Sequence, residues 1–462
     1  MTSSAFSRLK VSPDQLKALD ALGYTSMTPV QEQAIPLILQ GRDLVVRAKT
    51  GSGKTATFGI GLLSKINPRF FGAQALILCP TRELADQVGA EIRRLASQMA
   101  NIKVIMLCGG KPFGAQRDSL QHGAHVVVGT PGRIHDHLNK GTLAIDQVHT
   151  LVLDEADRML DMGFAETMQA IIAKVPKQRQ TLLFSATYPD NIRQISRSIQ
   201  QNPAMVEVED AVAHEDAVIE QVFFEIKKHE RQTTLLAFFE HHRPSNGIVF
   251  CNTKQQCGEV ADFLNQHDIE AKALHGDLDQ RERDQVLLQV ANGSCPVLVA
   301  TDVAARGLDI KALAMVVNFE LPRDPEVYVH RIGRTGRAGE TGLALSLVTE
   351  SETPRLRKIE LYQDQPGACD VPASLDRDPN YELKGDKVTI QIDAGRKQKM
   401  RPGDILGALT GDAGLQGTEI GKITIADYSS YVAVQRETLR QAMNFLSQGK
   451  IKGKSIRARR LR

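Results

Sequence analysis

Short aliphatic runs recur along the first half of the chain, and stretches with helical periodicity separate them. The runs read DLVVRA, ALILCP, KVIMLC, HVVVG, TLVLD and TLLFS, whereas segments such as ELADQVGAEIRRLASQM have a helical pattern. Near-continuous Val/Ile/Leu strands that alternate with helices are typical of a parallel sheet covered on both faces. The first series therefore predicts an α/β domain.

The same pattern pauses in a polar and acidic stretch around 202–216 and then resumes. The second series reads GIVFCN, KALHG, PVLVATD, MVVNFE and ALSLVT, and it resembles the first in order and spacing. We therefore expect two similar α/β domains, at 1–206 and 217–365, joined by a linker at 207–216.

A break rich in Pro, Gly and Asp, at 366–386, precedes a shorter pattern of a different kind. KVTIQID, GKITIAD, YVAVQ and the basic KSIRARRLR look like strands, and ILGALTG and ETLRQAMNFLSQ look helical. The resulting order, β-α-β-β-α-β, predicts a small α+β domain of the split, ferredoxin-like kind at 387–462.

Charge separates this tail domain from the rest of the chain. From Lys387 onward fifteen Lys and Arg stand against six Asp and Glu, a net charge of +9, whereas the whole chain carries +3. The preceding residues are therefore mildly acidic, at −6. This contrast indicates a polyanionic partner for the tail; a solvated basic face without a partner is the alternative.

Composition disfavours membrane and secreted proteins. No apolar run approaches the ~18 residues that span a bilayer, and the N-terminus MTSSAFSRLK lacks the apolar core of a signal peptide. The six cysteines are scattered without paired zinc-ligand spacing, and most lie in strand-like runs that predict buried thiols. We expect a reduced, cytoplasmic chain with no membrane partner and no disulfide-linked partner.

The stretch AKTGSGKT directly follows a strand-like run and precedes a helical pattern. A glycine-rich turn in this context lets successive backbone N–H groups face a phosphate chain, Lys54 reach the terminal phosphates and the Thr55 hydroxyl bind Mg²⁺. A chance flexible loop is the alternative, which the context disfavours. The expected ATP-binding residues of the loop are Ala48, Lys49, Thr50, Gly51, Ser52, Gly53, Lys54 and Thr55.

Three carboxylates crowd the end of the strand-like run TLVLD, at Asp154, Glu155 and Asp157. They repel one another unless a cation or hydrogen-bond donors neutralise them. In P-loop enzymes a carboxylate at such a strand end completes the Mg²⁺ shell, and a neighbour positions or deprotonates water. We expect Asp154 on the metal side and Glu155 as the general base, with Asp157 bonded to the hydroxyls of Ser185 and Thr187.

Taken together, these motifs resemble those of the DEAD-box RNA helicases. P-loop, DEAD and SAT are joined by PTRELA at 80–85, a Gly pair at 109–110, TPGR at 130–133, IVFCNTK at 248–254, ATDVAARGLDI at 300–310 and HRIGRTGRAG at 330–339. The resemblance covers most of residues 1–350. It implies two RecA-like domains, with ATP, Mg²⁺ and RNA bound across the cleft between them, and an RNA-stimulated ATPase that opens short duplexes.

The resemblance also implies contacts to the nucleoside. GYTSMTPVQ, at 23–31, is similar to the family's adenine-reading motif, with Gln31 at the base edge and Phe6 stacking on the ring. Met27 stands where the family usually has Pro. Asp309 is expected at the ribose.

Two arginines of HRIGRTGRAG match the family's arginine fingers. By resemblance, Arg334 and Arg337 reach the γ-phosphate from the second domain and stabilise the charge of the transition state. Because the general base lies in the first domain, hydrolysis should then require closure of the two domains. Arginines that only bridge the domain interface are the alternative.

RNA contacts are expected from loops on one face of both domains. Small residues and backbone amides suit phosphate contact without base reading, so this binding should not depend on sequence. Arg133 could equally pair with a carboxylate or cap a helix. The candidates are Arg82, Gly110, Thr130 and Arg133 in the first domain, and Thr253, Gly276 and Thr301 in the second. The resemblance assigns Asp157, Ser185 and Thr187 to coupling between the ATP and RNA sites.

The tail resembles the RNA-recognition-motif fold, and GRKQKMRPGDILGALTG with GKIKGKSIRARRLR resembles the DbpA subfamily of these helicases. Its strands offer only Tyr431 as an aromatic, which favours binding by basic loops over base stacking on the sheet. The candidate contacts are Arg396, Lys397, Lys399, Arg401, Lys450, Lys452 and Lys454.

The subfamily resemblance implies a target as well as a fold. It implies binding to a hairpin of large-subunit (23S) ribosomal RNA and a role in assembly of the 50S subunit. An ATP-gated RNA clamp with little strand separation would carry identical motifs and remains an alternative. The full DEAD-type motif set disfavours a translocating DNA helicase.

Overall fold

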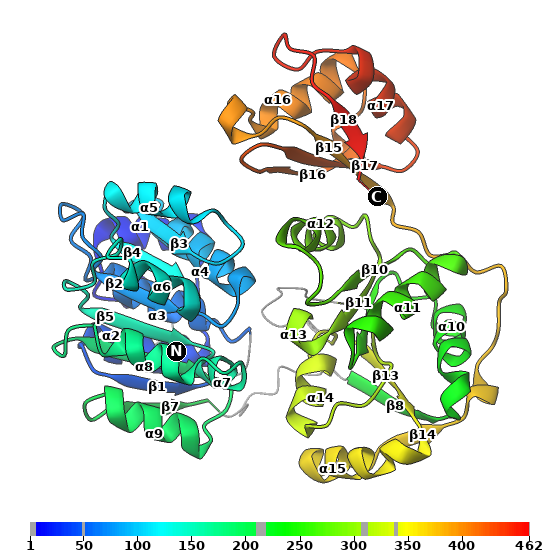
Figure 1. Cartoon of the computed structure of the whole chain (residues 1–462), viewed down its shortest axis with the longest axis horizontal. Coiled ribbons are helices and arrows are strands. Elements are labelled where there is room, and N and C mark those ends of the chain that lie inside the picture. The colour runs from blue at the N-terminus through cyan, green and yellow to red at the C-terminus, as the bar shows by residue number, and fades with distance from the viewer. Residues whose placement is uncertain (1–5, 49–50, 209–218, 306–312, 337–340, 462) are drawn as a thin grey trace. The chain divides into compact units, whose positions relative to one another are not determined.

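The computed structural model describes residues 6–48, 51–208, 219–305, 313–336 and 341–461. The chain forms two compact units, Met1–Ala213 and His214–Arg462 (Figure 1). The first unit contains one seven-stranded sheet; the second contains another seven-stranded sheet and a four-stranded sheet. No helix in the described part of the chain is both long and apolar enough to cross a bilayer.

The sheet of the first unit is parallel, in the order β3-β4-β2-β5-β6-β1-β7. Its strands are β1 (Leu44–Arg47), β2 (Ala75–Leu78), β3 (Val104–Leu107), β4 (Val126–Gly129), β5 (Thr150–Asp154), β6 (Gln180–Ser185) and β7 (Ala204–Glu207). The helical elements are η1 (Phe6–Arg8), α1 (Pro13–Ala21), α2 (Pro29–Leu39), α3 (Lys54–Leu63), α4 (Arg82–Leu95), α5 (Phe113–Gln121), α6 (Pro131–Asn139), α7 (Ala156–Asp161), α8 (Ala165–Ile172) and α9 (Asp190–Ile199).

Burial on both faces explains the aliphatic runs in this sheet. Every residue of β2, β4, β5 and β6 is buried. Alternate side chains enter two different core clusters: Leu76 and Leu78 lie in one, and Ala75 and Ile77 lie in the other. A parallel strand covered on both sides must be apolar throughout, which is the pattern that predicted β1 to β6.

The larger sheet of the second unit is also parallel, in the order β10-β11-β9-β12-β13-β8-β14. Its strands are β8 (Ile219–Glu225), β9 (Gly247–Cys251), β10 (Ala271–Leu274), β11 (Val297–Thr301), β12 (Met315–Asn318), β13 (Gly342–Val348) and β14 (Ala368–Asp370). The helical elements are η2 (Lys228–Glu230), α10 (Arg231–His242), α11 (Lys254–Gln266), α12 (Gln280–Ala291), α13 (Asp302–Ala305), α14 (Pro325–Ile332), η3 (Glu350–Glu352), α15 (Thr353–Gln363) and η4 (Pro372–Ser374).

The two large sheets have the same topology. When each set of strands is numbered from its own first strand, both orders read 3-4-2-5-6-1-7. The sequence-based expectation of two similar α/β domains is therefore confirmed. Within 366–386, predicted as a linker, β14 joins the sheet beside β8, and Leu375 packs in the core.

The four-stranded sheet forms the tail domain and is antiparallel, in the order β16-β17-β15-β18. Its order along the chain confirms the predicted β-α-β-β-α-β arrangement. The elements are β15 (Lys387–Ile392), η5 (Arg396–Gln398), α16 (Pro402–Gly407), η6 (Ala408–Asp412), η7 (Gly417–Glu419), β16 (Ile420–Ile425), β17 (Ser430–Gln435), α17 (Leu439–Gln448) and β18 (Ala458–Arg460).

Only one face of the tail sheet packs on the helices of its own domain. Ile390 and Val432 lie on that face, in the tail core. Thr389 lies on the opposite face and is nevertheless fully buried. Its hydroxyl accepts a 2.8 Å hydrogen bond from the amide of Asn292, just beyond α12, and lies 2.8 Å from the hydroxyl of Ser294. The second face of this sheet is therefore covered within the second unit.

Candidate functional site

The glycine-rich loop lies between β1 and α3. Gly51 and Gly53 have φ values of 89° and 88°, a conformation that favours glycine. The N-cap residue of α3 is Gly53, which makes no side-chain capping bond, and the start of a helix is a position where backbone N–H groups can bind an anion. Lys49 and Thr50 lie outside the described residues.

Lys54 is the first residue of α3 and is 7% exposed. Its ammonium donates a 2.5 Å hydrogen bond to the carbonyl of Ala48, at the other end of the loop. Burial lowers the pKa of Lys54, and the charges of Asp154 and Glu155 oppose that shift. The lysine thus sits in a desolvated position among carboxylates, as expected for a group that meets a phosphate.

The motif at 23–31 is attached to this loop by side-chain hydrogen bonds. The Thr28 hydroxyl donates to the carbonyl of Ser52 at 2.8 Å, and the Gln31 amide donates to the carbonyl of Gly53 at 3.4 Å. Gln31 also accepts from the backbone N–H of Thr28 at 2.8 Å, which completes a capping box for α2. The predicted adenine reader is thus positioned by the phosphate loop, while its contact with adenine remains a prediction.

Phe6, the predicted stacking aromatic, is only 2% exposed. Its ring meets that of Tyr24 edge to face, with centroids 5.3 Å apart. Both aromatic residues and Thr25 line a pocket of about 470 Å³. The structure therefore brings Phe6 next to the 23–31 motif, and stacking of its ring on adenine remains a prediction.

The three carboxylates at the end of β5 are all buried, with Asp154 at 2%, Glu155 at 6% and Asp157 at 8% exposure. Burial and the neighbouring charge of Glu155 raise the pKa of Asp154 to about 7. Glu155 adopts a left-handed backbone conformation, with φ at 53°, which a non-glycine residue adopts at some energetic cost. The expected crowding of negative charge is therefore present.

These groups fit the requirements of a magnesium site. Asp154 is buried and faces like charge, so a divalent cation would favour its ionised form. Carboxylate and hydroxyl oxygens, here Asp154 and the half-buried Thr55, are the ligands that Mg²⁺ prefers. The described residues contain no cluster of three or more His, Cys, Asp or Glu that could hold a metal, so water and phosphate oxygens would have to complete the shell.

Asp157 contacts the SAT segment, as predicted. Its carboxylate accepts hydrogen bonds from the Thr187 hydroxyl and the Thr187 backbone N–H, both at 3.0 Å, and from the N–H of Ala186 at 3.1 Å. Ser185 plays a different part from the one expected, because its hydroxyl accepts from the N–H of Asp157 at 3.4 Å. The contact is confirmed; the coupling role of the three residues remains a prediction.

The predicted RNA contacts of the first domain follow neighbouring strand ends. Arg82 starts α4 after β2, Gly110 follows β3 and Thr130 precedes α6 after β4. Strands β3, β4 and β2 are adjacent, so these residues lie at one edge of the sheet. Arg133 is engaged within the chain, donating to the carbonyl of Lys111 at 2.9 Å and to the Gln116 side chain at 3.0 Å. Its guanidinium thus holds the loop after Gly110.

The second domain repeats this arrangement. Thr253 follows β9, Gly276 follows β10 and Thr301 ends β11, and these three strands are again adjacent. Thr253 and Gly276 are exposed, whereas Thr301 is 9% exposed. Thr253 also caps α11, because its hydroxyl accepts from the N–H of Gln256 at 3.3 Å. Contact with RNA remains a prediction for all of them.

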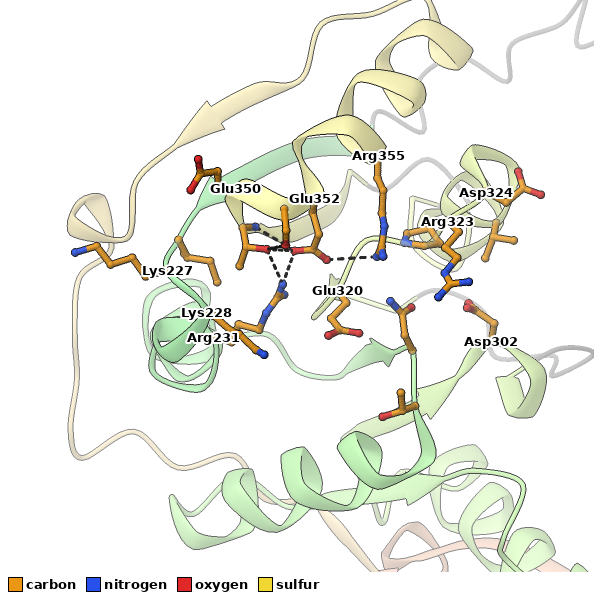
Figure 2. A pocket seen from close by; sticks show the side chains of 17 residues that line it. Lys227, Lys228, Arg231, Asp302, Glu320, Arg323, Asp324, Glu350, Glu352 and Arg355 are labelled. Atoms are coloured by element: carbon orange, nitrogen blue, oxygen red, sulfur yellow. Dashed lines mark hydrogen bonds and ion pairs between the residues drawn. The ribbon is translucent and has the colours of Figure 1, made fainter.

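A pocket of about 940 Å³ opens at the carboxyl ends of β8, β9, β11, β12 and β13 (Figure 2). Arg231, the first residue of α10, lies in this pocket and forms a buried ion pair with Glu352. Figure 2 shows that bonded pair, with Arg355 directed at the same carboxylate. The pocket occupies the same topological position in this sheet as the glycine-rich loop occupies in the first.

Of the two predicted arginine fingers, Arg334 follows α14 and is partly buried, while Arg337 lies outside the described residues, as does Asp309. The neighbouring Arg331, which the sequence did not single out, is 1% exposed. Its guanidinium donates to Asp302 at 2.6 and 2.7 Å and to Asn318 at 3.1 Å. Arg331 thus fixes the segment that carries Arg334.

Arg158 is a second residue that the motifs did not reveal. It is buried on α7 and forms a 2.9 Å ion pair with Glu155, the residue immediately before that helix. This pair orients the predicted general base and offsets part of the local negative charge. The three-residue spacing between Glu155 and Arg158 could have indicated this pair, because side chains three residues apart on a helix are neighbours. The sequence pattern predicts Glu155 at the end of a strand, where that rule does not apply.

The two basic loops of the tail lie together. Lys452 donates to the carbonyl of Lys399 at 3.1 Å and pairs with Asp404 at 3.2 Å. All seven predicted basic residues are exposed, namely Arg396, Lys397, Lys399, Arg401, Lys450, Lys452 and Lys454. Tyr431 is 9% exposed, which agrees with the preference for loops over the sheet.

Comparison with known proteins identifies relatives of each domain. Residues 28–195 match the family described as DEAD/DEAH box helicase, residues 227–339 match the helicase conserved C-terminal domain, and residues 389–460 match the DbpA RNA binding domain.

Relatives over the full length are also found. The ATP-dependent RNA helicase DbpA of Escherichia coli (strain K12) is 53% identical over 99% of this chain and 100% of its own length. The ATP-dependent RNA helicase DbpA of Bacillus subtilis (strain 168) is 38% identical over 98% of both chains. Among solved structures, S. cerevisiae Dbp5 bound to RNA and ADP BeF3 is 31% identical over 80% of this chain and 96% of that chain, with a TM-score of 0.73.

Proposed function

The chain belongs to the DEAD-box family of ATP-dependent RNA helicases that carry a DbpA RNA-binding domain, and from this premise we propose that it remodels large-subunit (23S) ribosomal RNA during assembly of the 50S subunit. Family membership makes it an RNA-stimulated ATPase. The proposal adds the target RNA and the role of each domain.

The observation that supports RNA targeting by the tail is the joined pair of basic loops. Lys452 bonds the loop at 395–401 through Lys399 and reaches Asp404 at the start of α16, so the two clusters form one surface. A surface of exposed Lys and Arg on a domain of net charge +9 suits RNA phosphates.

The proposed chemistry follows from the residues around the phosphate loop. Lys54 and the N–H groups of α3 would bind the phosphates, and Thr55 and Asp154 would hold Mg²⁺. Mg²⁺, when bound, neutralises charge that develops on the phosphate oxygens. Glu155, oriented by Arg158, would orient the attacking water and accept its proton.

The second domain would complete this site on closure. Arg334 and Arg337 would supply positive charge to the transferred phosphoryl group, and Asp309 would bind the ribose. RNA would bind across the strand-end residues of both domains without regard to sequence. Hydrolysis would therefore depend on ATP and RNA acting together to bring the domains into contact.

A deletion and a charge reversal in the tail domain test whether it targets the protein to ribosomal RNA. Deletion of 387–462 is expected to erase preference for ribosomal RNA while sparing weak ATPase stimulated by any RNA. As a finer test, Lys397→Glu with Lys454→Glu should weaken binding to a 23S hairpin at least tenfold and flatten its salt dependence. The matched control is Lys422→Glu with Arg440→Glu, two exposed residues of the same domain outside the loops.

Duplex opening and ATP turnover should be measured together on a duplex tethered to that hairpin. Opening with turnover supports remodelling, whereas turnover without opening would favour the ATP-gated clamp. If the tail deletion keeps full preference for ribosomal RNA, specificity resides in the two RecA-like domains and the targeting proposal is wrong.

A further inference from the structure

One aromatic side chain stands out on the tail domain. Tyr428, in the turn between β16 and β17, is 69% exposed, whereas Tyr431, three residues later, is 9% exposed. An exposed tyrosine alone is ordinary, because much of any protein surface is apolar. The neighbours of this turn make Tyr428 different.

The turn is fixed to the first basic loop by backbone hydrogen bonds. The N–H of Arg396 donates to the carbonyl of Ala426 at 2.8 Å, and the N–H of Lys397 donates to the carbonyl of Asp427 at 2.9 Å. An exposed ion pair of 3.3 Å also joins Arg396 to Asp427. The backbone immediately before Tyr428 is therefore held against a loop of exposed cations.

A glycine allows this close approach. A Cβ atom at Gly395 would lie 2.4 Å from the carbonyl oxygen of Ala426 and 2.6 Å from the nitrogen of Ser429. Only a residue without a side chain fits between the loop and the turn. The turn that carries Tyr428 is thus packed against the loop that begins at Gly395.

The sheet itself offers no comparable aromatic surface. Thr389 and Gln391, on the face away from the tail core, are 0% and 3% exposed. Tyr431, on the same face, is 9% exposed. Bases that reach this domain therefore meet the loops and the β16–β17 turn. Stacking on an aromatic ring contributes to single-stranded binding independently of base identity.

We propose that Tyr428 stacks on one unpaired nucleobase while the adjoining basic loops hold the phosphates on either side of that nucleotide. This inference rests on the proposed RNA-binding role of the tail and adds its recognition of unpaired nucleotides. The ligand class is RNA with a single-stranded loop or bulge, because the faces of paired and stacked bases are covered in a continuous duplex.

The absence of tryptophan from the chain allows a direct test. Tyr428→Trp places a single indole at the proposed stacking position. Its fluorescence in the full chain should be quenched on adding a 23S hairpin with an unpaired loop, and much less by the same strand annealed to its complement. Unchanged emission on binding that hairpin would overturn the stacking proposal.

Affinity measurements separate stacking from other roles. Tyr428→Ala should weaken hairpin binding about 5- to 150-fold, and Tyr428→Phe should stay within about threefold, because phenylalanine keeps the stacking face. Equal losses in both variants would assign the effect to the hydroxyl and overturn stacking. Tyr362→Ala, at a 57% exposed tyrosine of α15, is the matched control.

The Lys397→Glu, Lys454→Glu variant distinguishes failure of this inference from failure of the proposed function. If charge reversal weakens binding and the Tyr428 variants do not, the tail binds RNA without stacking on this residue, and the inference alone is wrong. If charge reversal and Tyr428→Ala both leave hairpin binding unchanged, RNA does not bind this surface and both proposals fall.

Discussion

The two parallel-sheet domains share one strand order but differ in the loop that follows the equivalent strand. In the first domain, β1 leads through Gly51 and Gly53 to Lys54 at the start of α3. In the second, β8 leads through the 3₁₀ turn η2 to Arg231 at the start of α10. Each loop thus delivers a cation to the first position of a helix, at the carboxyl edge of its sheet.

What surrounds that cation decides what each domain can bind. Lys54 donates a hydrogen bond to the backbone carbonyl of Ala48, and the negative charges of Asp154 and Glu155 act to raise its pKa. Arg231 instead pairs directly with Glu352, a carboxylate from the same domain. In the described part of the second domain, the place where a phosphate could meet Arg231 is therefore occupied by a carboxylate, whereas Lys54 of the first domain bonds a backbone carbonyl.

If the second domain binds no nucleotide of its own, its predicted arginine fingers would act on the ATP bound by the first domain. Arg334→Ala should then lower kcat for RNA-stimulated ATP hydrolysis by about 10³-fold or more, because a finger arginine stabilises charge that develops only in the transition state. ATP affinity without RNA should change little. Steady-state ATPase assays with nucleotide-binding titrations measure both, and Arg357→Ala, at an exposed arginine of α15, is the control. An unchanged rate would show that Arg334 is structural.

The first domain should show the complementary behaviour. Glu155→Gln should bind ATP and RNA but hydrolyse about 10²- to 10⁴-fold more slowly, since glutamine keeps the size and the hydrogen bond to Arg158 but cannot accept a proton. Single-turnover hydrolysis and RNA-binding assays on one preparation check this expectation. Glu166→Gln, at an exposed position of α8, is the matched control. Near-normal turnover would remove Glu155 as the base.

Features encoded by local patterns were predictable from the sequence. Strands β1 to β6 are continuous apolar runs, and the phosphate loop and the carboxylates after β5 are contiguous motifs with one physical interpretation. Strands β7, β8 and β14 were missed because their residues are partly exposed and polar positions interrupt them. Strands β7 and β14 lie at the edges of their sheets, where less apolar character is needed, whereas β8 lies between β13 and β14 and is polar at Glu220, Gln221 and Glu225.

Contacts between distant residues were beyond such patterns. Arg231 and Glu352 are separated by 121 positions, and nothing near either one indicates the other. Ser185 was expected to donate to Asp157, but its hydroxyl accepts from the backbone instead, because α7 presents an N–H there. Tyr428 lies in a turn, where composition alone does not say which neighbouring loop the side chain will join.

The Arg231–Glu352 pair offers the most direct way to sharpen the comparison of the two domains. Glu352 is 4% exposed and also accepts hydrogen bonds from the Thr349 hydroxyl at 2.8 Å and the N–H of Leu321 at 3.1 Å. Glu352→Ala should lower the free energy of unfolding of the second unit by about 3–5 kcal/mol, because it leaves a buried guanidinium unpaired. Urea titration with an amide-exchange readout of α10 would measure this loss.

A second variant separates the charge pair from simple packing. Arg231→Met with Glu352→Leu removes both charges and keeps side-chain volume, so its loss should be smaller than that of Glu352→Ala alone. Glu382→Ala, which breaks an exposed pair with Lys384, should cost less than about 1 kcal/mol. If Glu352→Ala proves as mild as that surface control, the carboxylate does not neutralise Arg231, and the contrast drawn between Arg231 and Lys54 is wrong.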